Sequence, residues 1–219
     1  MNQKEIYDIF DNYNAIWVHN GEATMPHAEL TTGLCSNGFI NCREVLKYTN
    51  ICKKLSEQLY YKVLREVVLR NVNLVVGSPY SAITFSYQFA ALSGKVHGFT
   101  EKDPSDPKGK KMVWKGGLIR AEEKVLQVEE LITTSSTFFE VRRAMQQANP
   151  ESINFLPFVA CIVHRPQNLS VNYNGIKIIS LIEKEIWSVK PEDCPLCKAG
   201  SKRLRPRGNW AELTGKKTE

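Results

Sequence analysis

The 219-residue chain has no apolar run that approaches the roughly 20 residues needed to cross a bilayer as a helix. Its first segment, MNQKEIYDIFDNYNAIW, carries acidic residues and lacks the basic, apolar and small-residue order of a secretory signal peptide. The sequence also lacks internal repeats and low-complexity tracts. We therefore expect a globular chain that works in the cytoplasm and has no membrane partner.

Cysteine is too scattered in this sequence to form a disulfide framework. Without an export signal we expect reduced thiols at Cys35, Cys42, Cys52, Cys161, Cys194 and Cys197. The segment Cys194-Pro-Leu-Cys197 has zinc-like spacing, but one pair supplies only two of the four ligands of a zinc site. The sequence has no second CxxC and no HxxxH. We therefore interpret this segment as a structural turn and expect no metal site formed by protein side chains alone.

Positive charge is concentrated at the end of the chain. The net charge is +6, and the seven basic and two acidic residues after position 197 contribute +5 of it. The basic residues are Lys198, Lys202, Arg203, Arg205, Arg207, Lys216 and Lys217, and the acidic ones are Glu212 and Glu219. We interpret 198–219 as a solvated basic tail, with a patch for nucleic acid or an acidic partner as the alternative.

The first third of the chain predicts two helices and a hairpin. An apolar helical period over residues 2–18 predicts an N-terminal helix, and a longer one over 43–72 predicts a second helix. Between them, the Gly-punctuated segment HAELTTGLCSNGFINC, residues 27–42, predicts two short strands joined by a turn.

Apolar strands then alternate with helices. Strands are predicted at 74–76, 96–101, 125–128 and 156–164, and a helix that ends at Gly94 follows the Gly-Ser-Pro loop. This alternation predicts one α/β domain with a central, mostly parallel sheet flanked by helices. We expect a small hood, built from about 1–42 and 170–200, on the same domain. The Lys-, Pro- and Gly-rich stretch 101–118 predicts a mobile loop, and loops of this length are often functional.

Residues 125–137, VLQVEELITTSST, carry the clearest functional pattern. Four mostly apolar residues lead into two carboxylates and a run of hydroxyl residues, and a helical pattern follows. At the carboxyl end of a strand, Glu129 and Glu130 can accept hydrogen bonds from ribose hydroxyls or help hold a hydrated metal ion. The loop after them can offer N–H and hydroxyl groups to a phosphate. The alternative is a surface turn in which Ser or Thr caps the helix.

This segment resembles the phosphoribosyl-pyrophosphate (PRPP) motif of type I phosphoribosyltransferases. Other segments resemble, in order, the early hairpin, pyrophosphate loop, catalytic loop and base-side strand of bacterial orotate phosphoribosyltransferases. These segments are HAELTTGLCSNGFINC, VVGSPYSAITFSYQFAALSG, FTEKD with GKKMVWKGGLI, and VACIVHRP. EIWSVKPEDCPLCKAGS resembles the tail of one subgroup. The ordered resemblance runs from about residue 5 to residue 202.

The resemblance implies a glycosyltransferase of pyrimidine biosynthesis that moves 5-phosphoribosyl from PRPP to a nitrogenous base, orotate, with release of pyrophosphate. It implies Mg²⁺ bound through PRPP and through Glu129 or Glu130, and a homodimer in which the 101–118 loop lies near the partner's site. Because that loop is also long and polar, we do not expect it to pack on its own core.

The resemblance also implies roles for individual residues. Glu129 and Glu130 would face the ribose, with Glu130 among the catalytic groups, and Arg165 would lie beside the base. The 5′-phosphate loop would consist of Thr133, Thr134, Ser135, Ser136 and Thr137, and the pyrophosphate loop would include Ser78, Tyr80 and Ser81. The mobile loop would supply positive charge from Lys102 with Lys110, Lys111 or Lys115. Trp114 in this loop is expected to pack rather than to stack on a base.

Several positions depart from the family pattern. Ser135-Ser136 and Ser81-Ala82 stand where the family has glycine-rich loops, and Glu130 stands where Asp is usual. In the hairpin, Thr31 replaces a common Lys or Arg and Cys35 replaces a common His, and His164 replaces an Asp beside Arg165. These departures leave two alternatives open. One is an enzyme that uses another base or a nucleotide, and the other is a binding or effector subunit, for example of a retron-type defence assembly.

Overall fold

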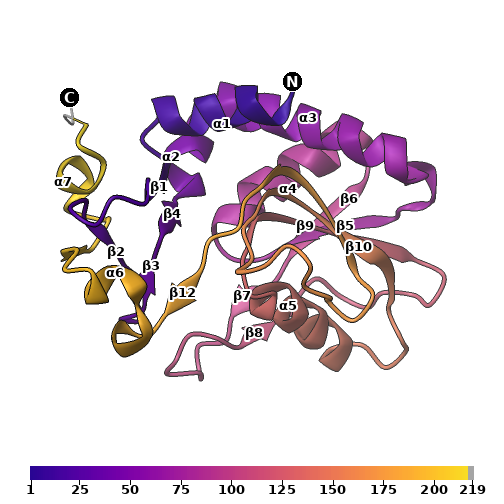
Figure 1. Cartoon of the computed structure of the whole chain (residues 1–219). Helices are drawn as coiled ribbons and strands as arrows, with labels where there is room; N and C mark the ends of the chain where they lie inside the picture. The colour runs from indigo at the N-terminus through magenta and orange to yellow at the C-terminus, as the bar shows by residue number, and fades with distance from the viewer. Residues whose placement is uncertain (217–219) are drawn as a thin grey trace.

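A five-stranded, all-parallel sheet forms the centre of the protein in this computed structural model, which describes residues 1–216 (Figure 1). The strand order is β11 (Lys177–Glu183), β10 (Asn154–His164), β9 (Lys124–Ile132), β5 (Leu74–Gly77) and β6 (Val96–Phe99). Counted along the chain, this is the doubly wound order 2-1-3-4-5, in which the winding reverses between β5 and β9. The α/β prediction is confirmed.

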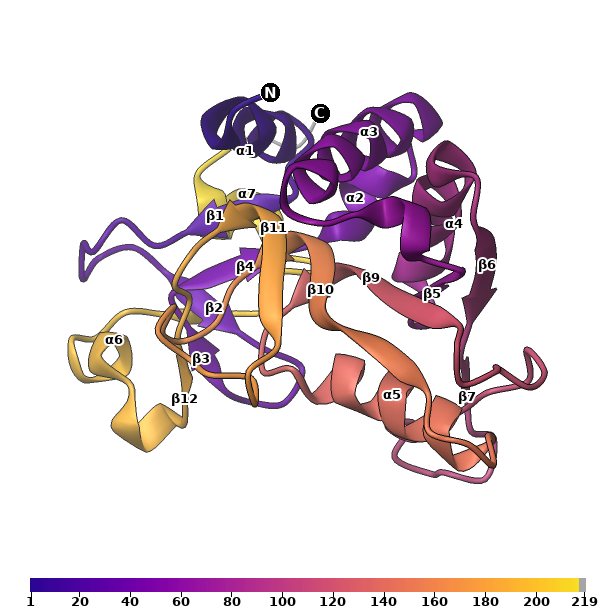
Figure 2. The same cartoon turned by 90° about the vertical axis from the view of Figure 1, so that its right-hand side faces the viewer.

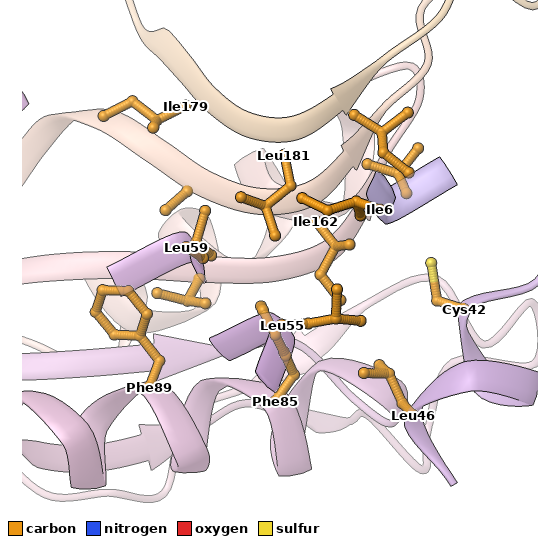
Figure 3. Close-up of a cluster of buried hydrophobic side chains, with 14 of the residues drawn as sticks. Ile6, Cys42, Leu46, Leu55, Leu59, Phe85, Phe89, Ile162, Ile179 and Leu181 are labelled. Carbon is orange, nitrogen blue, oxygen red and sulfur yellow. The ribbon is translucent and has the colours of Figure 1, made fainter. Parts of the chain in front are cut away.

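Helices cover both faces of the sheet. Figure 2 shows α1 (Gln3–Asn12), α3 (Thr49–Glu66) and α4 (Ser81–Ser93) on one side and α5 (Ser136–Gln147) on the other. In Figure 3, Leu55 and Leu59 of α3 and Phe85 of α4 meet Ile162 of β10 in the main core. Because both faces are covered, β5 is buried throughout and its sequence is apolar. Gly94 adopts a left-handed conformation at the end of α4, as a helix stop requires.

Two helix predictions were wrong in their bounds. The predicted helix over 2–18 ends at Asn12, because Asn14 takes a left-handed conformation (φ 52°) and turns the chain into β1 (Ile16–Val18). The predicted helix over 43–72 is divided into α2 (Cys42–Leu46), α3 and the 3₁₀ turn η1 (Leu69–Asn71). Extended backbone at Tyr48 and Val67 interrupts it.

The predicted hairpin belongs to a separate small layer, the hood, at the left of Figure 1. One hood sheet has the order β12 (Ser188–Val189), β3 (Cys35–Ser36), β2 (His27–Glu29) and β13 (Arg203–Leu204), and β1 pairs with β4 (Gly38–Ile40) beside it. Two short turns, η2 (Pro191–Asp193) and α6 (Pro195–Lys198), and helix α7 (Trp210–Thr214) complete the hood. Its apolar centre is small and consists of buried Trp17, Ala28, Leu204 and Leu213.

The basic C-terminal segment is packed rather than free. Residues 203–214 supply β13 and α7, so the solvated tail that the sequence predicted is wrong for this stretch. Lys202 pairs with Glu212 (2.5 Å) and Lys216 with Asp11 of α1 (2.6 Å). Arg203 and Arg205 both pair with Glu29. Lys217 and Glu219 lie outside the described residues.

The lysine-rich stretch 101–118 forms a second hairpin, in which β7 (Glu101–Lys102) pairs with β8 (Met112–Val113). Within residues 1–216, no helix combines the length and the apolar character that crossing a membrane would require.

Candidate active site

Two predicted loops meet where the sheet reverses its winding. Ser78, directly after β5, donates a hydrogen bond to Oε2 of Glu129 near the end of β9 (2.5 Å). Gln127 donates to the other carboxyl oxygen, Oε1 (2.7 Å). With both oxygens occupied, the Glu129 side chain is only 1% exposed. It therefore fixes the pyrophosphate loop against β9 and is not itself open to a ligand.

Burial also controls the charge of Glu129. Loss of solvent, and secondarily the neighbouring Glu130, raises the pKa of Glu129 to about 8, although the bonds from Ser78 and Gln127 oppose the rise. At neutral pH the carboxyl group is therefore mostly protonated in the folded protein.

Glu130 points to the opposite face of β9, because side chains alternate along a strand. It is partly buried, and among residues 1–216 its carboxylate has no side-chain hydrogen bond. Burial raises the pKa of Glu130, while its own amide and the charge of Arg43 oppose the rise. Of the predicted acidic pair, Glu130 is thus the carboxylate that can contact a ligand.

Arg43 is a site residue that the sequence reading missed. It lies in the first turn of α2, and its Nε donates to Oγ of Ser81 in the pyrophosphate loop (2.7 Å). It is exposed and influences Glu130, so one cation faces both predicted loops. Its only signal in the sequence is its place directly after the early hairpin.

The 5′-phosphate loop keeps a glycine-like backbone although it contains serine. Ser135 has φ 67°, in the left-handed region that glycine adopts without cost. Helix α5 begins at Ser136, and no side chain among residues 1–216 caps it. The amides of its first turn are therefore free of side-chain partners at the positive end of the helix.

Three of the four predicted lysines lie beside this helix start. A pocket of about 330 Å³ is lined by Lys102, Lys110, Lys111, Ser136 and Thr137, with Gly109, Met112 and Glu140. Oδ2 of Asp106 accepts hydrogen bonds from the amides of Lys110 and Lys111 (2.6 and 2.7 Å), which shapes the hairpin turn. Lys115 does not line the pocket and pairs instead with Glu101 (2.6 Å).

The expectation that this loop does not pack on its own core was wrong for its second half. Met112 and Trp114 are buried in a core cluster with Ile119, which directly follows the loop, and with residues of β5, β9 and α5. The indole Nε1 of Trp114 donates to the carbonyl of Gly117 (2.7 Å). The packing role expected for Trp114 is confirmed.

On the base side, Arg165 follows β10 and is half-buried. Its Nε is buried without a hydrogen-bond partner among the described residues, and burial lowers the pKa of its guanidinium. His164 is held by the hydroxyl of Tyr173 (2.9 Å), and burial lowers its pKa. Tyr80 and Thr31 are exposed. Arg165 is therefore the one base-side cation of the predicted set, and its Nε is unused.

Away from this site, Cys194 and Cys197 are joined by further potential ligands. His27 and Cys35 of the hood hairpin lie with them in one group whose ligand atoms are all within 4.8 Å of one another. The expectation that only two ligands were available is therefore wrong, because the fold brings His27 and Cys35 to Cys194 and Cys197 from a distant part of the sequence.

The chain is similar in sequence to known proteins of one kind. A scan against protein-family models finds no match. The orotate phosphoribosyltransferase of Desulforamulus reducens is 29% identical over 206 residues, which cover 94% of this chain and 97% of that protein. The orotate phosphoribosyltransferase of Heliobacterium modesticaldum is also 29% identical over 206 residues, 94% of this chain and 98% of its own.

Solved structures share the fold. The orotate phosphoribosyltransferase of Aeropyrum pernix superposes with a TM-score of 0.60 at 13% identity, covering 81% of this chain and 93% of that one. The Mycobacterium tuberculosis orotate phosphoribosyltransferase, solved with inorganic phosphate, gives 0.56 at 13% identity over 83% of this chain and 95% of its own. The chain is therefore similar in sequence to bacterial orotate phosphoribosyltransferases and shares the fold of solved orotate phosphoribosyltransferases.

Proposed function

We propose that this protein transfers 5-phosphoribosyl from PRPP to orotate and releases pyrophosphate. The observation that carries the proposal is the junction of the pyrophosphate loop and the PRPP motif, made by the hydrogen bond from Ser78 to Glu129 at the switch point of the sheet. A ligand held by both loops must carry phosphate groups at two places, as PRPP does.

The start of α5 is suited to the 5′-phosphate. Uncapped amides at a helix N-terminus bind anions through their N–H groups and the helix dipole. The hydroxyl groups of Thr133, Thr134 and Thr137 lie on the same loop. Serine at 135 and 136 leaves this geometry in place, because the left-handed backbone at Ser135 is retained.

Glu130 is suited to the ribose hydroxyls and to a magnesium ion that arrives with PRPP. Mg²⁺ prefers hard oxygen ligands and usually binds one or two carboxylates together with substrate phosphates, and the free carboxylate of Glu130 is such a donor. When bound, the ion would add positive charge to the pyrophosphate. Glu129, protonated and bonded to Ser78, acts as a positioning residue for the pyrophosphate loop.

The chain's own cations then stabilise the leaving group. The base nitrogen attacks C1 of the ribose while the bond from C1 to the pyrophosphate oxygen breaks, so negative charge develops on pyrophosphate. Arg43 faces the pyrophosphate loop, and Lys102, Lys110 and Lys111 line the pocket beside the start of α5. Cations placed in advance where charge develops are a principal source of catalysis.

Orotate is the proposed base because the buried Nε of Arg165 has no hydrogen-bond partner within residues 1–216. Unsatisfied buried donors are rare in proteins, and a carboxylate on the base would satisfy this one. A base without a carboxylate is the second candidate, since the hairpin turn presents exposed Thr31 rather than a cation. The effector-subunit alternative is weakened, because Lys202, Arg203, Arg205 and Lys216 are engaged in ion pairs.

We further propose a homodimer, as the family resemblance implies, which light scattering at high micromolar concentration tests. The activity itself is tested by pyrophosphate release from PRPP and Mg²⁺ with orotate, uracil or a purine base in parallel. Release that depends on orotate supports the proposal, and release with another base only supports the second candidate. No release with any base, although PRPP binds, would refute transferase activity.

A further inference from the structure

The hood brings four soft metal ligands together outside the PRPP site. They are Nε2 of His27 and the thiol sulfurs of Cys35, Cys194 and Cys197. Two come from the β2–β3 hairpin and two from the α6 turn, so the pair Cys35 and Cys197 is separated by 162 positions. In both Figure 1 and Figure 2, α6 lies beside β2 and β3.

The distances between these atoms fit a single tetrahedral ion. The sulfurs of Cys35 and Cys197 are 3.6 Å apart, and Nε2 of His27 lies 3.6 Å from Sγ of Cys194 and 3.4 Å from Sγ of Cys197. Around a zinc ion with ordinary bond lengths, two sulfurs lie about 3.8 Å apart and a sulfur and a nitrogen about 3.5 Å. All four donors are closer together than the ligands of an iron–sulfur cluster, which surround several irons.

The proton on His27 is placed as a metal ligand requires. Oγ of Ser201 donates its only hydrogen to the carbonyl of Met25 (2.6 Å), so towards Nδ1 of His27 (2.8 Å) it can only accept. Nδ1 therefore carries the proton in neutral His27, and the lone pair of Nε2 faces the sulfurs. A second hydrogen bond of this kind is the usual way in which a ligating histidine is oriented.

The surroundings resemble a closed structural site. His27, Cys35 and Cys194 are fully buried, and Cys197 is half-buried. The amide of Cys197 donates to Sγ of Cys194 (3.4 Å), which favours a charged sulfur at that position. Arg203 lies near enough to Cys35 and Cys197 for their charges to affect it. A divalent ion with three thiolates has one net negative charge, which this cation complements.

The small size of the hood also favours a cross-link that stabilises it. Its strands β2, β3, β12 and β13 have two or three residues each, and its apolar centre contains four buried residues. Units with so small a core usually depend on a disulfide or a metal for stability.

We propose that His27, Cys35, Cys194 and Cys197 bind one structural Zn²⁺ that fastens the hairpin to the C-terminal segment. Binding displaces the thiol protons to solvent, and the three thiolates and the neutral imidazole fill all four positions. The ion therefore has no open position for a substrate, and its role is to hold the hood in place.

The test begins with the metal content of full-length protein purified under reducing conditions without chelators. About one zinc per chain is expected in wild type and in Cys52→Ala, a variant of a buried cysteine on α3. Cys197→Ala should lose it. Ser201→Ala, which removes only the partner of His27, should lower zinc affinity about 10- to 100-fold. Cobalt in place of zinc should give the absorption of a tetrahedral, thiolate-bound ion.

If Cys197→Ala does not fold, wild type still decides the question. A strong chelator should lower its melting temperature, and Zn²⁺ but not Mg²⁺ should restore it. Three results would overturn the proposal. They are a metal-free wild type whose melting temperature does not change when zinc is added, a Cys35–Cys197 disulfide in the native protein, or the same zinc content per chain in Cys197→Ala and Cys52→Ala.

Discussion

Replacing Glu129 with glutamine is expected to remove a pH dependence from the stability of the protein. The pKa of Glu129 is about 8 in the folded chain, whereas its ordinary value is 4.5. Between these values the folded protein holds a proton that the unfolded chain has released. Raising the pH therefore favours the unfolded state, and this contribution is complete below pH 4.5 and lost as the pH rises to about 8.

The size of the effect follows from the width of this window. Each pH unit within it corresponds to about 1.4 kcal/mol, so the loss between pH 5.5 and 7.5 is roughly 3 kcal/mol. For a chain of this size, that is a shift of roughly 5 to 10 °C in melting temperature. Glutamine has the shape of the protonated acid and can still bond to Ser78 and Gln127, but it does not titrate.

Thermal unfolding of the ligand-free protein at several pH values measures this directly. Glu129→Gln should gain stability relative to wild type as the pH rises from 5.5 to 7.5. The control is Glu122→Gln, an exposed acid on the same segment, which should follow wild type. If wild type and Glu129→Gln instead change in parallel, Glu129 is not the buried, protonated group described above.

Four further substitutions, one of them a control, test individual cations. Arg165→Ala should lower kcat/KM for orotate about 10- to 100-fold, because one charge-assisted pair is worth about 1.5–3 kcal/mol. Calorimetry should show unchanged PRPP binding, and an equal loss of PRPP affinity would contradict a base-side role. Arg43→Ala should weaken product inhibition by pyrophosphate about 10-fold, and unchanged inhibition would remove Arg43 from the site. Lys111→Ala should lower kcat about 10-fold, because Lys111 lines the pocket. Lys115 pairs with Glu101 instead, so Lys115→Ala should leave kcat near the wild-type value. A larger loss in Lys115→Ala than in Lys111→Ala would overturn the assignment of the lysine pocket.

Four of the five strands of the central sheet could be predicted from apolar segments, whereas β11 lies within the stretch 170–200 that we expected in the hood. Leu74, Val75 and Val76 form a run that only a covered strand explains, and the carboxylates at 129 and 130 mark its ligand-binding edge. The hood could not be predicted in detail. Its strands have two or three residues, and their pairing depends on partners such as Leu204 with Ala28, far apart in the sequence.

The same limit applies to the sites. A motif search finds Glu129 and Glu130 together, but it cannot tell that alternation along the strand buries one of them and leaves the other accessible. Arg43 belongs to no motif and reaches Ser81 only through the fold. His27 and Cys35 become candidate metal ligands only because the hood folds back on itself.

Calorimetry with PRPP and Mg²⁺ tests the central claim most directly, because it asks whether the PRPP motif is a working site. Wild type should bind, and Glu130→Ala should bind about 10- to 100-fold more weakly, since a carboxylate that accepts bonds from ribose hydroxyls is worth about 1.5–3 kcal/mol. Glu122→Ala, an exposed acid at the start of the same segment, should bind like wild type. Equal binding by wild type and Glu130→Ala, or binding by neither, would contradict the assignment of this site.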